Sequence, residues 1–199
     1  MKTYILSIAL LLSTAIYASK NPVLESELSF KITYHNLQLG YVKAIKHASA
    51  IRNTYTVFGK AESDLFLKKI VSENCIHSIF EDNKLLSAVT FVKRNGKTLS
   101  NTSTKLLQEK YIISSIEQIS QLKRNEIDFT VALLYFQEPL GIENIYSEAW
   151  GKILPLNSHN NEYRFTIPDG TVCTFKYKNG VLEEVTSNTV IGEIKFTRE

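Results

Sequence analysis

Apolar and polar residues alternate along most of this chain, and this period of two begins near Leu28. In the segment LSFKITYH, Leu28, Phe30 and Ile32 would share one face of a strand, and the polar residues between them would share the other. A helix needs a period of 3.6, so the pattern restricts most of the chain to strands with one buried face. The alternation returns in four segments of the last third, residues 162–167, 171–178, 181–187 and 190–198.

The short linkers between these segments contain residues suited to tight turns. Asn95-Gly96 separates two alternating segments, and the same device returns in KNGV at residues 178–181. EDNKL at residues 81–85 and IPDGT at residues 167–171 are further turn signals. Consecutive hairpins predict an all-β protein, a strongly curved antiparallel meander sheet of the open barrel or roll kind.

One region breaks the period. From Phe129 to Phe136 the chain reads FTVALLYF, which is too continuously apolar for a strand with one wet face, and Pro139 and Gly141 then interrupt it. It could be a central strand or a short helix. We expect at most one short helix, near residues 129–136, in a segment that packs against the concave side of the sheet.

The N-terminus has the features of a secretory signal. Lys2 is followed by an uncharged run from Tyr4 to Tyr17, and Ala18 offers the small residue that a signal peptidase requires. The sequence therefore predicts a cleaved signal peptide at residues 1–18 and a single β domain at residues 19–199, exported to the periplasm or secreted. Past Lys20 no stretch has the length of a membrane helix, so no transmembrane segment is expected in the mature chain.

Charge and cysteine content limit the partners and the covalent structure. The formal net charge is +3 and falls to +2 without Lys2, which gives no support to nucleic acid binding. Cys75 and Cys173 are far apart in the sequence of a protein expected in an oxidising compartment. They could form one disulfide or remain two small buried thiols on different strands.

Four motifs in the second half resemble a known family. They are LYFQEPLG from Leu134, IYSEAWGKILPL from Ile145, NEYRFTIPDGT from Asn161 and YKNGVLEEV from Tyr177. In this order they are similar to the bacterial exported family called domain of unknown function 6134, known mostly from Bacteroidota, and the likeness covers nearly the whole mature chain. The resemblance implies a strongly curved antiparallel sheet and carries over no activity or catalytic residue. Trp150 departs from the pattern, where a Phe-like residue is expected.

Motifs for familiar catalytic chemistry are absent from the sequence. The four histidines lie in four separate segments without metal-ligand spacing, no G-x-S-x-G motif occurs, and every glycine is isolated. We therefore predict no catalytic residue, no metal and no cofactor.

The binding candidates are Tyr135, Phe136, Glu138, Glu148 and Trp150. The aromatic rings could line an apolar pocket or stack on sugar rings, although aromatic residues in a small β protein more often belong to the core. The two glutamates could be polar groups at the lip of a cavity. In the structural alternative, Glu138 bonds to the backbone near its turn, and Glu148 pairs with Lys152 or Arg164.

Three functions stay open. The first is a non-enzymatic envelope protein that binds an apolar or amphiphilic ligand, or another envelope protein, on its curved sheet. An unfilled cavity bounded by Tyr135, Phe136 and Trp150 would favour it. The second is an enzyme acting on envelope glycans or lipids, with Glu138 or Glu148 as acid or base. The third is a scaffold or assembly accessory, for which an exposed edge strand would be the sign. The partner itself is not identified by the sequence.

Overall fold

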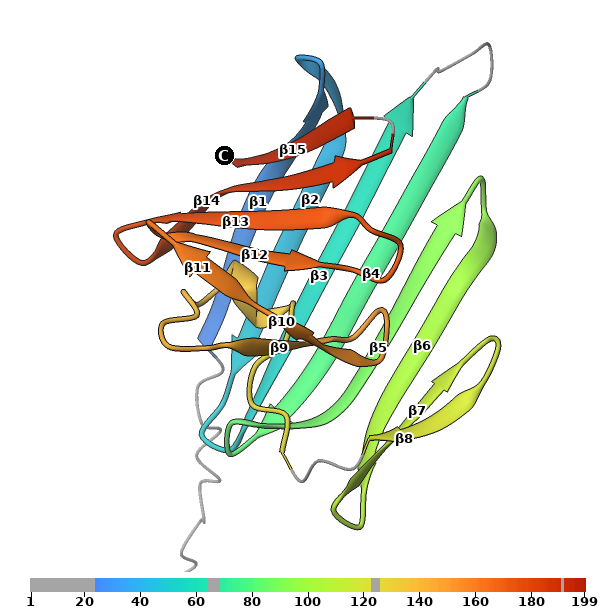
Figure 1. The fold of residues 1–199 in the computed structure, drawn as a ribbon, viewed down its shortest axis with the longest axis vertical. Helices are drawn as coiled ribbons and strands as arrows, with labels where there is room; N and C mark the ends of the chain where they lie inside the picture. The colour runs from blue at the N-terminus through green and yellow to red at the C-terminus, as the bar shows by residue number, and fades with distance from the viewer. Residues whose placement is uncertain (1–23, 64–68, 123–125, 191) are drawn as a thin grey trace, which may run out of the picture.

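Antiparallel strands make up almost all of the protein (Figure 1). The structure, a computed structural model, describes residues 24–63, 69–122, 126–190 and 192–199. The predicted signal peptide at residues 1–18 lies outside these ranges and stays a prediction. No helix among the described residues is long and apolar enough to cross a membrane.

Thirteen strands form one sheet in the order β11-β12-β13-β14-β15-β1-β2-β3-β4-β5-β6-β7-β8. The first eight are β1 (Leu24–Tyr34), β2 (Leu37–Ala48), β3 (Arg52–Ser63), β4 (Ile70–Glu81), β5 (Lys84–Arg94), β6 (Lys97–Leu107), β7 (Lys110–Ser115) and β8 (Ile119–Leu122). The last five are β11 (Asn157–His159), β12 (Glu162–Thr166), β13 (Val172–Lys178), β14 (Val181–Thr189) and β15 (Gly192–Arg198), while β9 (Asn144–Ser147) and β10 (Lys152–Pro155) form a separate pair.

Six of the hairpins turn through two consecutive residues with positive φ. Asn95-Gly96 does so with φ values of 49° and 78°, and Asn179-Gly180 with 54° and 77°, as the sequence predicted. Two-residue turns of this kind match the twist of the strands they join, and asparagine and glycine tolerate the conformation best. The other four turns lie at residues 35–36, 82–83, 108–109 and 160–161.

The C-terminal strand joins the two halves of the chain into one sheet. β15 pairs with β1 from Phe30↔Arg198 to Tyr34↔Ile194, and β1 continues the sheet through β2. Figure 1 shows β12–β15 crossing in front of the long strands β1–β4, so that the sheet presents two layers. β8 and β11 are its two edges, and the sheet therefore does not close on itself.

The chain itself fills most of the space between the layers. We call the face that carries Phe30, Val42, Phe80 and Phe175 the inner face, and residues 127–156 the plug segment. Inner-face and plug residues form one hydrophobic core, in which Leu134, Ile145 and Tyr146 are 0% exposed. Burial of a leucine or isoleucine side chain stabilises a fold by roughly 1.5 to 3 kcal/mol, which anchors the plug segment firmly.

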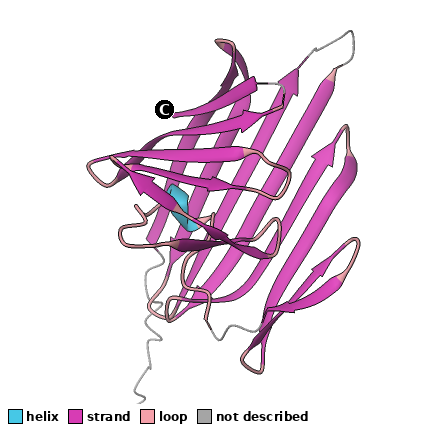
Figure 2. Ribbon diagram, viewed as in Figure 1, coloured by secondary structure: helices cyan, strands magenta, loops and turns pink. Residues whose placement is uncertain are grey.

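The plug segment contains one short helix, within the range expected from the sequence. It is the 3-10 helix η2 (Leu133–Tyr135), the only helical element among the described residues (Figure 2). The N–H groups of Leu133 and Leu134 bond to the carbonyl groups three residues earlier, at 3.1 and 3.2 Å, which is the pattern of a 3-10 helix. Pro139 then prevents its continuation.

Candidate functional site

Tyr135 and Phe136 belong to the core between the two layers. The Tyr135 ring lies edge-on to Phe30, with centroids 5.5 Å apart, and to Phe175, at 5.8 Å. The Phe136 ring packs against Tyr55 at 5.5 Å. Burial raises the pKa of the Tyr135 hydroxyl far above its usual value. Both rings therefore pack the plug segment against the strands of the sheet.

Glu138 lies at the end of the plug segment's helical turn, beside β12. The Tyr163 hydroxyl donates a hydrogen bond of 2.9 Å to its Oε1. Burial raises the pKa of Tyr163 to about 12, and the Glu138 carboxylate adds to the shift. The carboxylate has a side-chain partner on β12 in place of the backbone partner that the sequence suggested.

Glu148 lies at the start of η2 and is 1% exposed. Its Oε1 accepts hydrogen bonds from the Ser78 hydroxyl at 3.0 Å and from the Ala132 N–H at 3.2 Å, and its Oε2 accepts one from the Val131 N–H at 3.1 Å. Burial raises the pKa of the Glu148 carboxyl, and the neighbouring hydroxyl and N–H groups oppose the rise. This carboxyl therefore satisfies the Ala132 N–H, which the start of the helix leaves without a backbone partner, and shares the Val131 N–H with the Tyr146 carbonyl.

The expected pairing of Glu148 with Lys152 or Arg164 is wrong. Arg164 instead bonds to Glu162 on β12, and Glu148 is directed into the core toward β4. The two candidate carboxylates are also held apart, because Glu138 bonds to Tyr163 on β12 while Glu148 bonds to Ser78 on β4.

Hydroxyl groups on the inner face hold the plug segment at further points, which the sequence did not reveal. Thr102 donates to the Ala149 carbonyl at 2.9 Å, and Thr104 bonds to the Tyr146 hydroxyl at 2.6 Å. The Tyr177 hydroxyl on β13 donates to the Leu134 carbonyl. Thr102 and Thr104, two residues apart on β6, were the signal for polar groups on this face, but their partners are distant in the sequence.

Removal of one such contact has a measurable consequence at Tyr111. Its hydroxyl donates to the Leu85 carbonyl at 2.9 Å and accepts from the Ile127 N–H at 3.1 Å. We expect Tyr111→Phe to lower the free energy of unfolding by about 2 kcal/mol, because the buried Ile127 N–H loses its partner. Chemical denaturation measures the loss. Tyr41→Phe, at an exposed position, is the control, and an equal loss in both variants would contradict the bridging role.

Trp150 lies apart from the other aromatic candidates, at the rim of the molecule. It is 39% exposed and borders a hollow of about 290 Å³. We call this the rim hollow. It is lined by Leu99, Ser100, Asn101, Thr102, Ser115, Ile116, Glu117, Gln118, Ala149, Trp150 and Lys152. Trp150, Leu99 and Ile116 bring apolar surface to it, and amide, hydroxyl and charged groups surround them, so the hollow is amphipathic.

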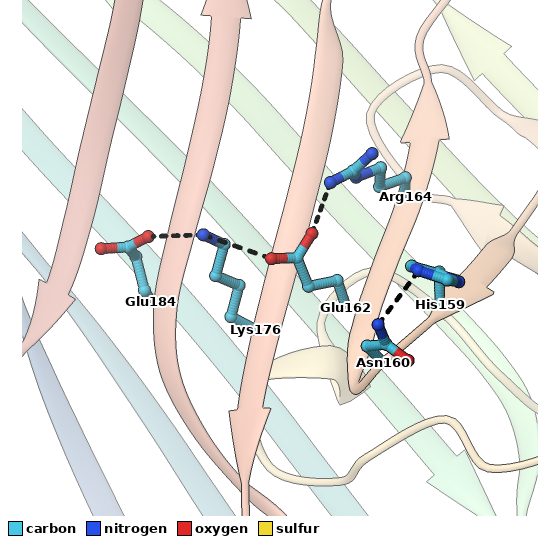
Figure 3. A network of polar contacts seen from close by, with 6 residues as sticks. All are labelled: His159, Asn160, Glu162, Arg164, Lys176 and Glu184. Carbon is cyan, nitrogen blue, oxygen red and sulfur yellow. Dashed lines mark hydrogen bonds and ion pairs between the residues drawn. The ribbon is translucent and has the colours of Figure 1, made fainter.

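A second, more polar hollow of about 280 Å³ lies over β12–β15. Figure 3 shows Lys176 between Glu162 and Glu184, at 3.3 and 3.4 Å, with Arg164 on the other side of Glu162. The hydrogen bond from Arg164 lowers the pKa of Glu162, and Glu162 raises the pKa of Lys176. Lys195 bonds to Glu184 at 3.1 Å. Because these cations already have carboxylate partners, we assign the row to cross-strand pairing.

The remaining candidates from the sequence are the cysteines. Cys75 on β4 and Cys173 on β13 are both free thiols. Cys173 packs against the core, and burial raises its pKa to about 11. Cys75 alternates with Ile76 and Ser78 of the inner face and so lies on the opposite face of the sheet. Among the described residues no group of three or more histidine, cysteine, aspartate or glutamate side chains is placed to hold a metal ion.

The fold and the sites define an all-β protein. It has one open thirteen-stranded antiparallel sheet, a separate pair of strands, an inner face covered by the plug segment, and an amphipathic hollow at the rim. A family model described as a domain of unknown function (DUF6134) matches residues 30–199. The chain therefore belongs to the DUF6134 family, as its sequence motifs predicted. No curated protein and no solved structure matches it.

Proposed function

We propose that this protein is an exported bacterial envelope protein, without enzymatic activity, that binds an apolar or amphiphilic partner at the rim hollow. The observation that carries the proposal is the exposure of Trp150 at 39%, beside Leu99 at 47% and Ile116 at 63%. Tryptophan is enriched where binding energy concentrates, because it buries a large rigid surface. Export is supported by the signal-like residues 1–18.

The rim is favoured over the inner face because the plug segment already occupies the inner face. Tyr135 and Phe136 pack within the core, whereas Trp150 faces the hollow beside β6. The expected cavity bounded by all three side chains is thus replaced by a core and a separate surface site. The plug segment is also hydrogen-bonded to β4, β6 and β13, which supports the view that it is a fixed part of the core and is not displaced by a ligand.

The positions of the carboxylates favour binding over catalysis. Glu138 accepts a hydrogen bond from Tyr163, and Glu148 is buried with three donors around it. A general acid or base must reach a substrate proton through a hydrogen bond. Neither carboxylate lines the rim hollow.

Fluorescence of Trp150 tests the proposal directly, because it is the only tryptophan in the sequence. We expect octyl and decyl maltoside, below their micelle concentrations, to shift its emission in a saturable manner as alkyl chains displace water from the indole ring. Calorimetric titration should show binding at least about tenfold weaker in Trp150→Ala, a difference of about 1.4 kcal/mol. Ile119→Ala, which removes another exposed apolar side chain, should bind normally. No saturable shift with either maltoside would overturn the proposal.

A further inference from the structure

The first five residues of β6 have a neighbouring strand on one side only. β6 spans Lys97–Leu107, but β7 pairs with it only from Thr102↔Ser115 to Leu107↔Lys110. Residues 97–101 pair with β5 except at Leu99, and no described strand lies along their other side. Figure 1 shows the β7–β8 hairpin ending partway along β6, so that the beginning of β6 borders open space. All five residues are exposed.

The rim hollow lies directly at this free edge. Leu99, Ser100 and Asn101 form one wall of it, and the turn at residues 115–118, where β7 ends, forms another. Leu99 is also a bulge, because Ser100 pairs with Val92 and Thr98 with Lys93, which leaves Leu99 without a partner on β5. A bulge re-aims a side chain, and Leu99 contributes to the lining of the hollow.

Positive charge surrounds the same edge. Lys93, Arg94 and Lys97 occupy the β5–β6 hairpin beside Asn95-Gly96, and Lys152 lines the hollow. Glu117 is the only acidic residue in the lining. An approaching chain with carboxylates near the hairpin would gain attraction at this rim.

We propose that the edge at residues 97–101 takes an extended segment of a partner protein, which adds as a strand beside β6. The added strand occupies the place that β7 would fill if it continued beyond Ser115. It inserts an apolar side chain between Leu99 and Trp150 and directs acidic residues toward the β5–β6 hairpin. Main-chain hydrogen bonds supply affinity in such complexes, and a pocket for a side chain supplies specificity. The inference rests on the proposed function of the rim hollow and names its partner.

The edge of β6 is a better acceptor than the two terminal edges of the sheet. β8 is short, and its Ile119 side chain is 76% exposed. No residue of β8 lines the rim hollow, and the nearest lining residue in the chain is Gln118, one residue before the strand begins. β11 has only three residues, all polar. Within the described part of the sheet, only β6 combines a free strand edge, an amphipathic hollow beside that edge and positively charged residues nearby.

The test uses a library of ten-residue peptides in which threonine alternates with Val, Ile, Leu, Phe or Tyr, with two glutamates at one end. We expect its best members to shift the Trp150 emission, with dissociation constants in the micromolar range, and to slow hydrogen exchange at residues 97–101. N-methylation of alternate peptide amides on the bonding edge should weaken binding at least tenfold while leaving all side chains intact. Peptides that bind with no protection of residues 97–101, or equally well when N-methylated, would overturn strand addition.

Variants separate the edge from the hollow. We expect the double variant Arg94→Glu, Lys97→Glu to bind the acidic peptides at least tenfold more weakly and to prefer peptides with lysines at that end. Lys105→Glu, on the paired part of β6, should leave the binding of both kinds of peptide unchanged. Ile119→Lys on β8 should leave peptide binding unchanged. If maltosides bind while no peptide of the library does, strand addition fails and the function of the rim hollow stands. If neither binds, both fail.

Discussion

Replacement of Glu148 by alanine is expected to lower the free energy of unfolding by about 4 kcal/mol. The substitution leaves the hydroxyl of Ser78 and the N–H of Ala132 without their acceptor inside the core. Each unsatisfied buried group costs about 1 to 3 kcal/mol, and the space vacated by the carboxylate adds a cavity cost. The Val131 N–H is less affected, since it also bonds to the Tyr146 carbonyl at 3.1 Å. Guanidinium denaturation, followed by circular dichroism, measures the effect.

Glu148→Gln is the matched control and should cost about 1 kcal/mol. The amide oxygen can still accept from Ser78 and Ala132, and the Thr130 hydroxyl, which lies beside the Glu148 carboxyl, can accept from the amide N–H₂ group. That hydroxyl is buried and makes no hydrogen bond of normal geometry among the described residues. A loss in Glu148→Gln as large as that in Glu148→Ala would show that the charge, rather than the acceptor geometry, holds the plug segment.

The difference in stability between the wild type and Glu148→Gln should depend on pH, and the direction of the change follows from the pKa of Glu148. Burial raises the folded-state pKa of Glu148 above its ordinary value of 4.5, so the folded state holds the proton more tightly than the unfolded state does. The wild type should therefore gain stability relative to Glu148→Gln as the pH falls from neutral toward about 4.5, and the gain should level off below that value. If the difference in unfolding free energy between the wild type and Glu148→Gln moved toward the variant on acidification, the raised pKa of the buried Glu148 carboxyl would be contradicted.

Alternation and turn chemistry predicted the strands because both are local. The four strands expected in the last third occur as β12–β15, and Asn95-Gly96 and Asn179-Gly180 form the expected turns. The pairing of β15 with β1 is not local, since it joins the two ends of the chain, and no turn signal encodes it. That pairing is what creates two layers and the space for the plug segment.

The candidate site was predictable in part, for the same reason. An apolar segment at residues 129–136 that lacks a wet face must be buried, and it is. The sequence could not separate Trp150 from Tyr135, because nearness along the chain suggested nearness in space, whereas Tyr135 packs against β1 and β13 and Trp150 lies beside β6. The free edge of β6 depends on where β7 ends, which follows from the register of the two strands.

Gly40→Ala is the second substitution for which we expect a large loss of stability, about 3 kcal/mol in the free energy of unfolding. Gly40 lies on β2 opposite Ala61 of β3, next to a bulge at Leu39, where the pairing with β1 skips one residue. A Cβ atom at Gly40 would lie 1.9 Å from the Lys60 carbonyl oxygen and 2.8 Å from the Ala61 Cα. These are backbone atoms, so the two strands must separate locally to admit a methyl group.

Gly59→Ala on the adjacent strand distinguishes this backbone contact from a general intolerance of side chains in the sheet. Its Cβ atom would lie 2.3 Å from the Asn74 amide oxygen, the end of a side chain that can rotate away. We expect Gly59→Ala to cost about 1 kcal/mol or less, because only that rotation and the loss of its contacts oppose the new methyl group. Chemical denaturation of both variants measures the difference. Equal losses would mean that β2 and β3 yield easily at the bulge, and the close approach at Gly40 would then not be a constraint on the fold.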